Sequence, residues 1–234
     1  MSLVIKEIKS NHYKVEPIAM ANDQIIKDVE APLPSNYGFF LLLVGRPNSG
    51  KSTLWLNLIN KKAKNTYYNK FDKVFIFSAS LSTITTKIKL NEERMFNGIE
   101  QLESVVNKIK ETPEEKNLII IDDLITDFKD EDYILKLVYN RRHLAIGGSV
   151  SLIVTSQVFT KVQLCIRKCA TTLILFNTGS KKELESIYQD FVNIDNNTFY
   201  GLVRHCFKNS SHDFILMDNT NGLYYHNFNL LQFD

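Results

Sequence analysis

The sequence predicts a three-layer α/β domain with a mainly parallel central sheet and a C-terminal β-hairpin. Two observations predict this class. Short runs of consecutive apolar residues alternate with segments of helical periodicity, which is typical of parallel strands covered on both faces by helices. The 234 residues include 44% hydrophobic and 23% charged residues, which is ordinary globular composition. A chain of this length is expected to form one domain.

Five apolar runs are the predicted strands. Each run is short and uninterrupted, as expected for a strand buried on both faces. The predicted strands are residues 39–44, 73–77, 118–121, 151–155 and 171–176. Four segments carry apolar residues at helical spacing and are the predicted helices, at residues 52–62, 96–110, 130–142 and 181–191.

A hairpin is predicted at the end of the chain, over residues 214–228, because Asn221-Gly222 favours a tight turn. Prolines and weak alternation in residues 1–36 predict an N-terminal arm that carries a short strand. We therefore divide the single domain into this arm, a core of residues 37–200 and a C-terminal hairpin extension of residues 201–234.

The charges nearly balance, with a formal net charge of +2. This balance excludes a histone-like polycation but leaves room for a local nucleic-acid-binding patch. The 3 cysteines are too few for a disulfide framework and fit a reducing compartment. The sequence has neither an apolar leader nor a run of about 20 apolar residues. We therefore expect a soluble, intracellular protein with no membrane span.

A phosphate-binding loop is predicted between the first strand and the first helix. Residues 45–52 read GRPNSGKS and fit the pattern G-x-x-x-x-G-K-[ST]. Glycines let the backbone aim its N–H groups at phosphate oxygens, and the following helix presents its positive end. Lys51 is expected to reach the β- and γ-phosphates and Ser52 to bind Mg²⁺. The predicted nucleotide-binding residues are Gly45, Arg46, Pro47, Asn48, Ser49, Gly50, Lys51, Ser52 and Thr53.

This motif specifies the fold class as a P-loop NTPase of the RecA-like (ASCE) type, with ATP and Mg²⁺ as ligands. Asp122 and Asp123 directly follow the strand predicted at residues 118–121. A carboxylate at such a strand end holds Mg²⁺ in P-loop NTPases, so Asp122 is the predicted metal ligand. Asp123 is the predicted general base for the attacking water. The alternative is that the two acids only cap a helix or form a turn.

Gln157 follows the strand predicted at residues 151–155. If this strand lies between the phosphate-loop strand and the Asp122 strand, Gln157 faces the γ-phosphate and can orient water. Phosphoryl transfer also uses a cation, often an arginine from a neighbouring subunit. Arg142 and Arg167 are the candidates for this arginine finger. For Arg142 the alternative is a cation that only complements a helix dipole.

Several segments resemble the FtsK–HerA translocases, and above all the genome-packaging ATPases of poxviruses, other large nucleocytoplasmic DNA viruses and virophages. The resemblance extends over residues 36–228, and its most discriminating parts surround Arg142-His143 and Thr155-Ser156-Gln157. The similar segments are residues 73–78, 142–146, 152–157, 166–170 and 182–188, Asp122-Asp123, and the hairpin with Asp218 and Tyr224-Tyr225.

The resemblance implies an ATP-hydrolysing motor that forms a homo-oligomeric ring, a pentamer or hexamer, and drives double-stranded DNA into a preformed capsid. It implies capsid proteins as further partners and a place in the host cytoplasm, the viral factory or the virion. Many relatives carry Glu where this chain has Asp123, so the assignment of the base stays open. No appended DNA-reading domain is recognisable, which implies a partner for start-site recognition.

Two other functions fit a phosphate loop. A small-molecule P-loop kinase would need an arginine-rich lid, and only 6 of the 28 cationic residues are arginines. A nucleotide-gated assembly or remodelling module would bind ATP to change shape and would turn it over slowly.

Overall fold

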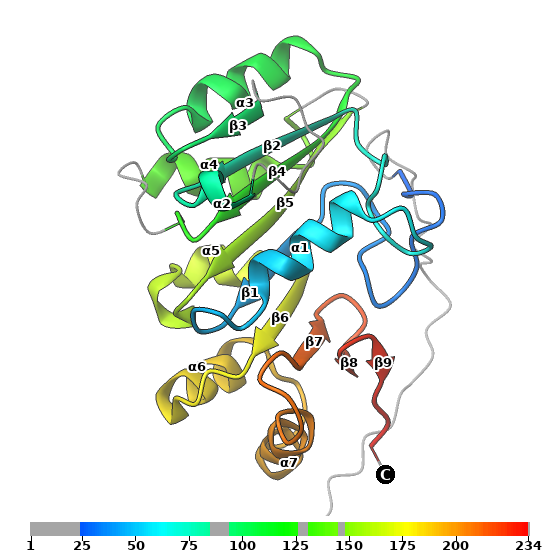
Figure 1. The fold of residues 1–234 in the computed structure, drawn as a ribbon, viewed down its shortest axis with the longest axis vertical. Coiled ribbons are helices and arrows are strands. Elements are labelled where there is room, and N and C mark those ends of the chain that lie inside the picture. The colour runs from blue at the N-terminus through cyan, green and yellow to red at the C-terminus, as the bar shows by residue number, and fades with distance from the viewer. Residues whose placement is uncertain (1–23, 85–93, 126–130, 145–147, 234) are drawn as a thin grey trace, which may run out of the picture.

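The computed structural model describes residues 24–84, 94–125, 131–144 and 148–233, and these form a twisted sheet with helices on both faces (Figure 1). The strands lie in the order β3-β2-β4-β5-β1-β6-β7-β8-β9. The first six in this order are parallel, and β7, β8 and β9 continue the sheet in antiparallel fashion. Their bounds are β1 Phe40–Val44, β2 Lys73–Ser78, β3 Met95–Phe96, β4 Lys116–Asp122, β5 Ser149–Ser156, β6 Thr172–Phe176, β7 Phe214–Asp218, β8 Leu223–His226 and β9 Asn229–Leu230.

Seven α-helices and one 3₁₀ turn are present in the described residues. They are α1 Lys51–Asn60, α2 Leu81–Ile84, α3 Leu102–Glu111, α4 Glu131–Asn140, the 3₁₀ turn Phe159–Lys161, α5 Leu164–Lys168, α6 Lys181–Phe191 and α7 Asn196–Cys206. No helix in these parts of the chain is long and apolar enough to cross a membrane.

Alternate side chains of the central strands enter two separate cores, which produces the three layers. In β1, Phe40 and Leu42 belong to the core that α3, α4, α5, α6 and α7 cover. Leu41 and Leu43 point to the other face and join Trp55 of α1. Because successive side chains of a strand point to opposite faces, an uninterrupted apolar strand fills both cores at once. The three-layer α/β class and the five predicted core strands are confirmed.

The helix predicted at residues 96–110 is wrong at its start. Phe96 belongs to the edge strand β3, where it pairs with Phe77 of β2 and stacks on its ring with centroids 4.8 Å apart. Gly98 follows in the left-handed region with φ 122°, and the helix begins only at Leu102. Pairing and aromatic packing thus override the helical periodicity at this end.

The described part of the predicted N-terminal arm, residues 24–36, contains an isolated bridge between Ile25 and Asn36. Residues 1–23 of the arm lie outside the described residues, so the short strand predicted for the arm stays a prediction. Helix α7 was not predicted, and it crosses position 200, where the predicted core ends. The predicted hairpin is confirmed as β7 and β8, with Gly222 at φ 67° in its turn.

The strand order decides where the polar strand ends meet. Strand β5 lies between β4 and β1, which is the arrangement that the prediction for Gln157 required. The carboxyl ends of these parallel strands share one edge of the sheet, where open α/β sheets bind ligands. The phosphate loop follows β1, the paired aspartates end β4, and Gln157 follows β5 at this same edge.

Candidate functional site

The phosphate loop adopts a conformation that depends on its glycines. Gly50 has φ 107°, a left-handed value that a side chain would strain, and it immediately precedes α1. A Cβ added at Gly45 would lie 2.6 Å from the Phe176 Cβ atom, closer than atoms can pack. The Ser49 hydroxyl is buried and has no hydrogen-bond partner among the described residues. The loop therefore keeps an unused polar group, which suits a bound phosphate.

The Lys51 ammonium group lies over this loop, and the side chain is only 5% exposed. Its Nζ donates hydrogen bonds to the carbonyl oxygens of Gly45 at 2.7 Å and Arg46 at 3.2 Å. Burial lowers the pKa of Lys51, while the carboxylates of Asp123 and Asp122 act in the opposite direction. The structure thus holds a desolvated cation in place, ready to exchange carbonyl partners for phosphate oxygens.

The Asp122 carboxylate is the centre of a convergent hydrogen-bond network. Trp55 Nε1 and Thr155 Oγ1 donate to its Oδ1 at 3.1 and 2.9 Å. Ser78 Oγ donates to Oδ2 at 3.2 Å, and Ser52 Oγ lies 3.2 and 3.3 Å from the two carboxylate oxygens. Carboxylate and hydroxyl oxygens are the ligands that Mg²⁺ prefers. The oxygen atoms of Ser52 and Asp122 therefore fit Mg²⁺ and could serve as its protein ligands.

Asp123 turns away from Asp122 and toward the loop. Its φ of 56° lies in the left-handed region, and its N–H donates to Thr155 Oγ1 at 2.9 Å. Its side chain is 32% exposed, with Oδ2 3.9 Å from Lys51 Nζ. Gln157 Nε2 donates to the same oxygen at 3.3 Å. The structure therefore brings together Lys51, Asp123 and Gln157, which can contact a water beside the terminal phosphate.

Arg167 lies away from this group and is engaged in the core. Its Nη2 forms an ion pair with Asp190 Oδ2 at 2.8 Å, and its Nη1 donates to the Phe159 carbonyl at 3.2 Å. The guanidinium also lies 4.4 Å from the centroid of the Phe159 ring. The side chain is buried. These contacts give Arg167 a structural role that joins α5 to α6, and they do not present it as a finger.

Arg142 is exposed and lies at the opposite edge of the sheet. A Cβ added at Gly38, just before β1, would lie 2.7 Å from the Arg142 Cγ atom. The five-residue strand β1 therefore separates Arg142 from the loop of its own subunit by roughly 17 Å. Its neighbour Arg141 is buried and donates to the Gly38 carbonyl at 2.8 Å. Arg142 therefore lies far from the phosphate loop of its own subunit.

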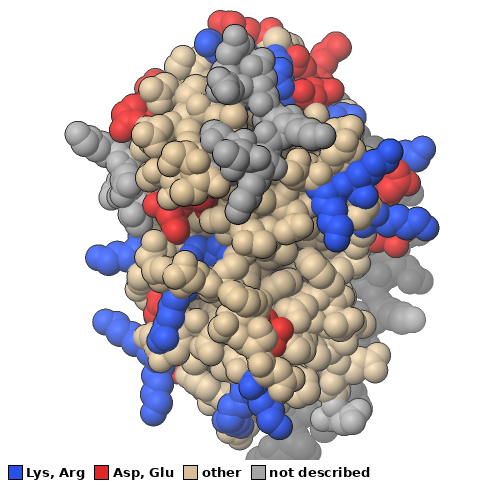
Figure 2. All heavy atoms as spheres, viewed as in Figure 1, with Lys and Arg blue, Asp and Glu red and all other residues tan. Residues whose placement is uncertain are grey.

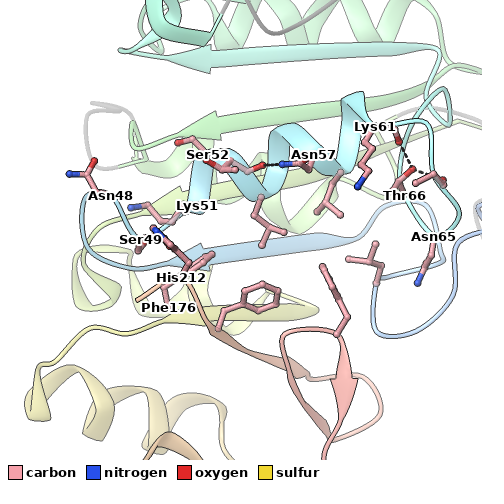
Figure 3. A pocket seen from close by; sticks show the side chains of 18 of the residues that line it. Asn48, Ser49, Lys51, Ser52, Asn57, Lys61, Asn65, Thr66, Phe176 and His212 are labelled. Carbon is pink, nitrogen blue, oxygen red and sulfur yellow. Dashed lines mark hydrogen bonds between the residues drawn. The ribbon is translucent and has the colours of Figure 1, made fainter. Parts of the chain in front are cut away.

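A cavity of about 1030 Å³ extends from the phosphate loop along α1 (Figure 3). Its polar end contains Lys51, Ser52, Asp123 and Gln157, and Pro47, Asn48 and Thr53 also line it. Apolar side chains also line the cavity, beginning beside the loop, and Lys61, Asn65 and Thr66 lie at its far end (Figure 3). The apolar lining consists of Leu33, Leu54, Leu58, Phe176, Phe214 and Phe228. Among the described residues, Asp123 is the one carboxylate in this lining, so the cavity suits a polyphosphate with a flat apolar group attached.

Sequence reasoning missed two groups of residues at this site. Ser78 and Thr155 stand at the carboxyl ends of two predicted strands, so the rule that ligands bind at that edge could have found them. Phe214 and Phe228 lie far along the chain, at the two ends of the predicted hairpin. No local motif marks them, and only the antiparallel pairing of β7 with β6 places Phe214 opposite Phe176.

Lysine and arginine side chains are spread around the face in Figure 2, with acids between them. On the part of this face that the structure describes, no single basic patch dominates. The basic pair Lys61-Lys62 follows α1, and Lys61 lines the cavity. A surface for DNA is therefore not evident on the described part of the face that Figure 2 shows.

The fold is similar to those of several ATPases. B204, the DNA-packaging ATPase from Sulfolobus turreted icosahedral virus, matches with a TM-score of 0.60 and 17% identity, covering 83% of this chain and 99% of that chain. The genome packaging NTPase B204 from Sulfolobus turreted icosahedral virus 2, in complex with AMPPCP, matches with a TM-score of 0.59 and 18% identity, covering 82% and 98%. The cytoplasmic domain of the type VII secretion ATPase EccC from Thermomonospora curvata matches with a TM-score of 0.54 and 15% identity, covering 84% of this chain and 24% of that one.

At these identities the structural matches show the fold, and the family is shown by sequence. No curated protein matches the chain. A family model described as poxvirus A32 protein matches residues 33–199. The matched region includes the phosphate loop, the paired aspartates, Arg142 and Gln157. The chain therefore belongs to the poxvirus A32 protein family.

Proposed function

We propose that this chain is an ATP-hydrolysing motor that moves double-stranded viral DNA into a capsid. The observation that carries the proposal is the meeting of Lys51 and Asp123 in a cavity large enough for a nucleotide, with Asp122 within hydrogen-bond distance of Ser52 at the same edge of the sheet. Membership of the poxvirus A32 family supports it. So does the likeness to the fold of B204, which is described as a DNA-packaging ATPase.

The loop and Lys51 bind the phosphates of ATP in this proposal. The backbone of residues 45–52 surrounds the β- and γ-phosphates, and Lys51 exchanges its carbonyl partners for phosphate oxygens. Ser52 and Asp122 would hold Mg²⁺, and the ion would supply positive charge to the phosphate oxygens. The Asp122 carboxylate stays fixed by its Trp55 and Thr155 donors throughout.

Asp123 and Gln157 act on the attacking water. The oxygen of the water attacks the γ-phosphorus, and Asp123 accepts the proton that the water loses. The bond from the γ-phosphorus to the oxygen of the ADP leaving group breaks. Gln157 is neutral, and its contact with Asp123 lets it orient the water without adding charge. Arg142 of one subunit supplies positive charge to the site of its neighbour, which requires a closed ring.

The partners in this proposal are double-stranded DNA, further copies of the chain and the capsid. A ring can gather a few lysines from each subunit around one pore, so the nearly balanced charge of the chain is compatible with DNA binding. The setting is the infected cell, in the cytoplasm or viral factory, or the virion.

The first test measures ATP hydrolysis with and without duplex DNA. We expect duplex DNA to stimulate turnover, and we expect the stimulation to fall steeply as salt rises because phosphate contacts release counterions. Asp123→Asn should lower turnover about 100-fold or more while nucleotide affinity stays within about three-fold, since a general base contributes to the chemical step.

A turnover that ignores DNA across a broad range of salt contradicts the motor. An Asp123→Asn protein that still hydrolyses ATP at the original rate contradicts the role of this carboxylate. Slow turnover combined with nucleotide-dependent partner binding would instead favour the assembly or remodelling module.

A further inference from the structure

We infer that the C-terminal hairpin supplies the nucleobase half of this site, as an aromatic wall made by Phe176, Phe214 and Phe228. The wall stacks on the flat face of a purine and makes no hydrogen bonds to the polar edge of the ring. The protein therefore accepts both adenine and guanine nucleotides. The inference rests on the proposed nucleotide hydrolysis and adds to it the class of base that the site accepts.

The three rings form a continuous row along the cavity. The Phe176 and Phe214 centroids lie 5.4 Å apart, and those of Phe214 and Phe228 lie 5.3 Å apart. Phe176 ends β6 and pairs with Phe214 at the start of β7, while Phe228 lies between β8 and β9. The open end of the hairpin, where Phe214 and Phe228 lie, is thus placed beside β6, next to the phosphate loop.

This row begins directly beside the phosphate loop. A Cβ at Gly50 would lie 3.5 Å from Cε1 of Phe176 and 3.6 Å from Nδ1 of His212. His212 Nδ1 also lies 3.3 Å from the Ser49 carbonyl oxygen. Figure 3 shows Phe176 and His212 next to the loop, with α1 on the other side of the cavity. A nucleotide whose phosphates occupy the loop therefore has its base against the aromatic row.

Exposure indicates which ring remains available to a ligand. Phe176 and Phe214 are 1% and 7% exposed, so the sheet already covers most of both rings. Phe228 is 44% exposed although it lines the cavity. Stacking on a base would cover this apolar surface, and stacking tolerates any base because each has a π-face.

Three neutral polar side chains that line the cavity each bond the backbone through one of their atoms. Asn57 Nδ2 donates to the Thr53 carbonyl at 2.7 Å, and Thr66 Oγ1 donates to the Ala63 carbonyl at 3.0 Å. Asn65 Oδ1 accepts from the Glu30 N–H at 2.8 Å. Strong discrimination between bases requires hydrogen bonds dedicated to the base edge. Because these three atoms are engaged and stacking on a ring does not distinguish the bases, adenine and guanine should bind about equally.

The test compares Phe228→Ala with Phe233→Ala. Phe233 is also 44% exposed and contacts Tyr224 of the same hairpin, with centroids 5.8 Å apart, but it does not line the cavity. Calorimetry would measure the binding of ATP, GTP and inorganic tripolyphosphate, which has the charge but no base. Thermal melting of each variant checks the fold.

We expect Phe228→Ala to weaken ATP and GTP binding about ten-fold, because a stacking partner is removed. Tripolyphosphate binding should stay unchanged, and Phe233→Ala should bind all three ligands as the original protein does. Phe228→Trp should restore or improve nucleotide binding. In the original protein, affinities for ATP and GTP should agree within about ten-fold.

Equal loss of ATP and tripolyphosphate affinity in a folded Phe228→Ala protein would overturn the inference, as would no loss at all. A preference of 1,000-fold or more for one purine, a discrimination of the size that dedicated hydrogen bonds give, would overturn the claim that the edge is not read. These outcomes leave the motor untouched, since DNA-stimulated hydrolysis of ATP is measured separately. Conversely, a protein that binds purine nucleotides as described but hydrolyses none of them would contradict the motor alone.

Discussion

At the scale of single residues, the Asp122 carboxylate is fixed from several directions by groups outside the phosphate loop. Ser78, Thr155 and Trp55 come from β2, β5 and α1, and each donates to it. Trp55 is fully buried, and its N–H has this carboxylate as its partner. Groups that orient a metal ligand in this way commonly tune metal affinity. Trp55 is thus a positioning residue for the metal ligand.

Trp55→Phe tests this role, because it keeps an aromatic ring and removes the N–H donor. A hydrogen bond to a charged group contributes about 1.5–3 kcal/mol, so the Mg²⁺ concentration for half-maximal hydrolysis should rise roughly ten-fold. Nucleotide binding measured without Mg²⁺ should not change. Titration of activity with Mg²⁺ at saturating ATP checks this.

Ser78→Ala is the matched variant, since it removes another donor to Asp122 from a different strand. It should shift the Mg²⁺ requirement in the same direction. An unchanged Mg²⁺ requirement in a folded Trp55→Phe protein, with a raised KM for ATP, would show that Trp55 only packs the core.

The predicted site residues divide into those that a local pattern could place and those that it could not. Lys51 and Ser52 were predictable because the loop that holds them is continuous in sequence. The contact between Gln157 and Asp123 required the strand order, which the apolar runs alone do not determine. The left-handed backbone of Asp123 has no marker in the sequence, because aspartate adopts this region only where its surroundings require it.

At the scale of elements, the central strands were predictable because an uninterrupted apolar run has few other places in a globular protein. The ends of the helices were less predictable from the sequence than the strands. Residues 96–101 carry helical spacing, but β2 offers a pairing edge to Met95 and Phe96. Helix α7 carries apolar residues beside many polar ones, and its N-cap is Asp195, which accepts from the N–H groups of Asn197 and Thr198. An N-cap of this kind is a start signal that the sequence carries directly before α7.

Substitutions of the two candidate finger arginines should have different effects on the free energy of unfolding. Arg167 pairs with Asp190 and joins α5 to α6. Arg167→Met leaves a mostly buried carboxylate without its partner, which should lower the free energy of unfolding by about 3 kcal/mol. Arg142→Ala changes an exposed side chain and should alter that free energy by less than about 0.5 kcal/mol. Urea unfolding of both variants provides the measurement.

Hydrolysis gives the complementary result. Arg142→Ala should lose DNA-stimulated turnover by about 1,000-fold while it keeps nucleotide binding, as expected for a finger. An Arg142→Ala protein with normal turnover, beside a stable Arg167→Met protein that has lost it, would reverse the two assignments.

At the scale of the whole molecule, Arg142 and the phosphate loop lie at opposite edges of one sheet. A single subunit therefore presents a nucleotide site at one edge and an arginine at the other. Head-to-tail contact places the arginine of each subunit near the site of the next, and such contacts close into rings when the rotation permits. This placement of the two groups is compatible with the proposed ring.

A mixing experiment tests whether sites are shared between subunits. Lys51→Ala subunits keep Arg142, and Arg142→Ala subunits keep Lys51, so each alone should be inactive. In a one-to-one mixture that assembles at random, about a quarter of the sites contain both groups, so about a quarter of the original turnover should return. If both variants form rings and their mixture stays inactive, Arg142 does not act on a neighbouring site.

The hydrogen bond between Trp55 and Asp122 has a practical consequence for kinetics. The chain contains 1 tryptophan, so all of its tryptophan fluorescence comes from Trp55. That indole lies 3.1 Å from the carboxylate that is proposed to hold the cation. The unmodified protein therefore carries a built-in optical reporter at its reaction centre, and each cycle of loading and release can be timed by stopped-flow fluorescence without attaching a dye.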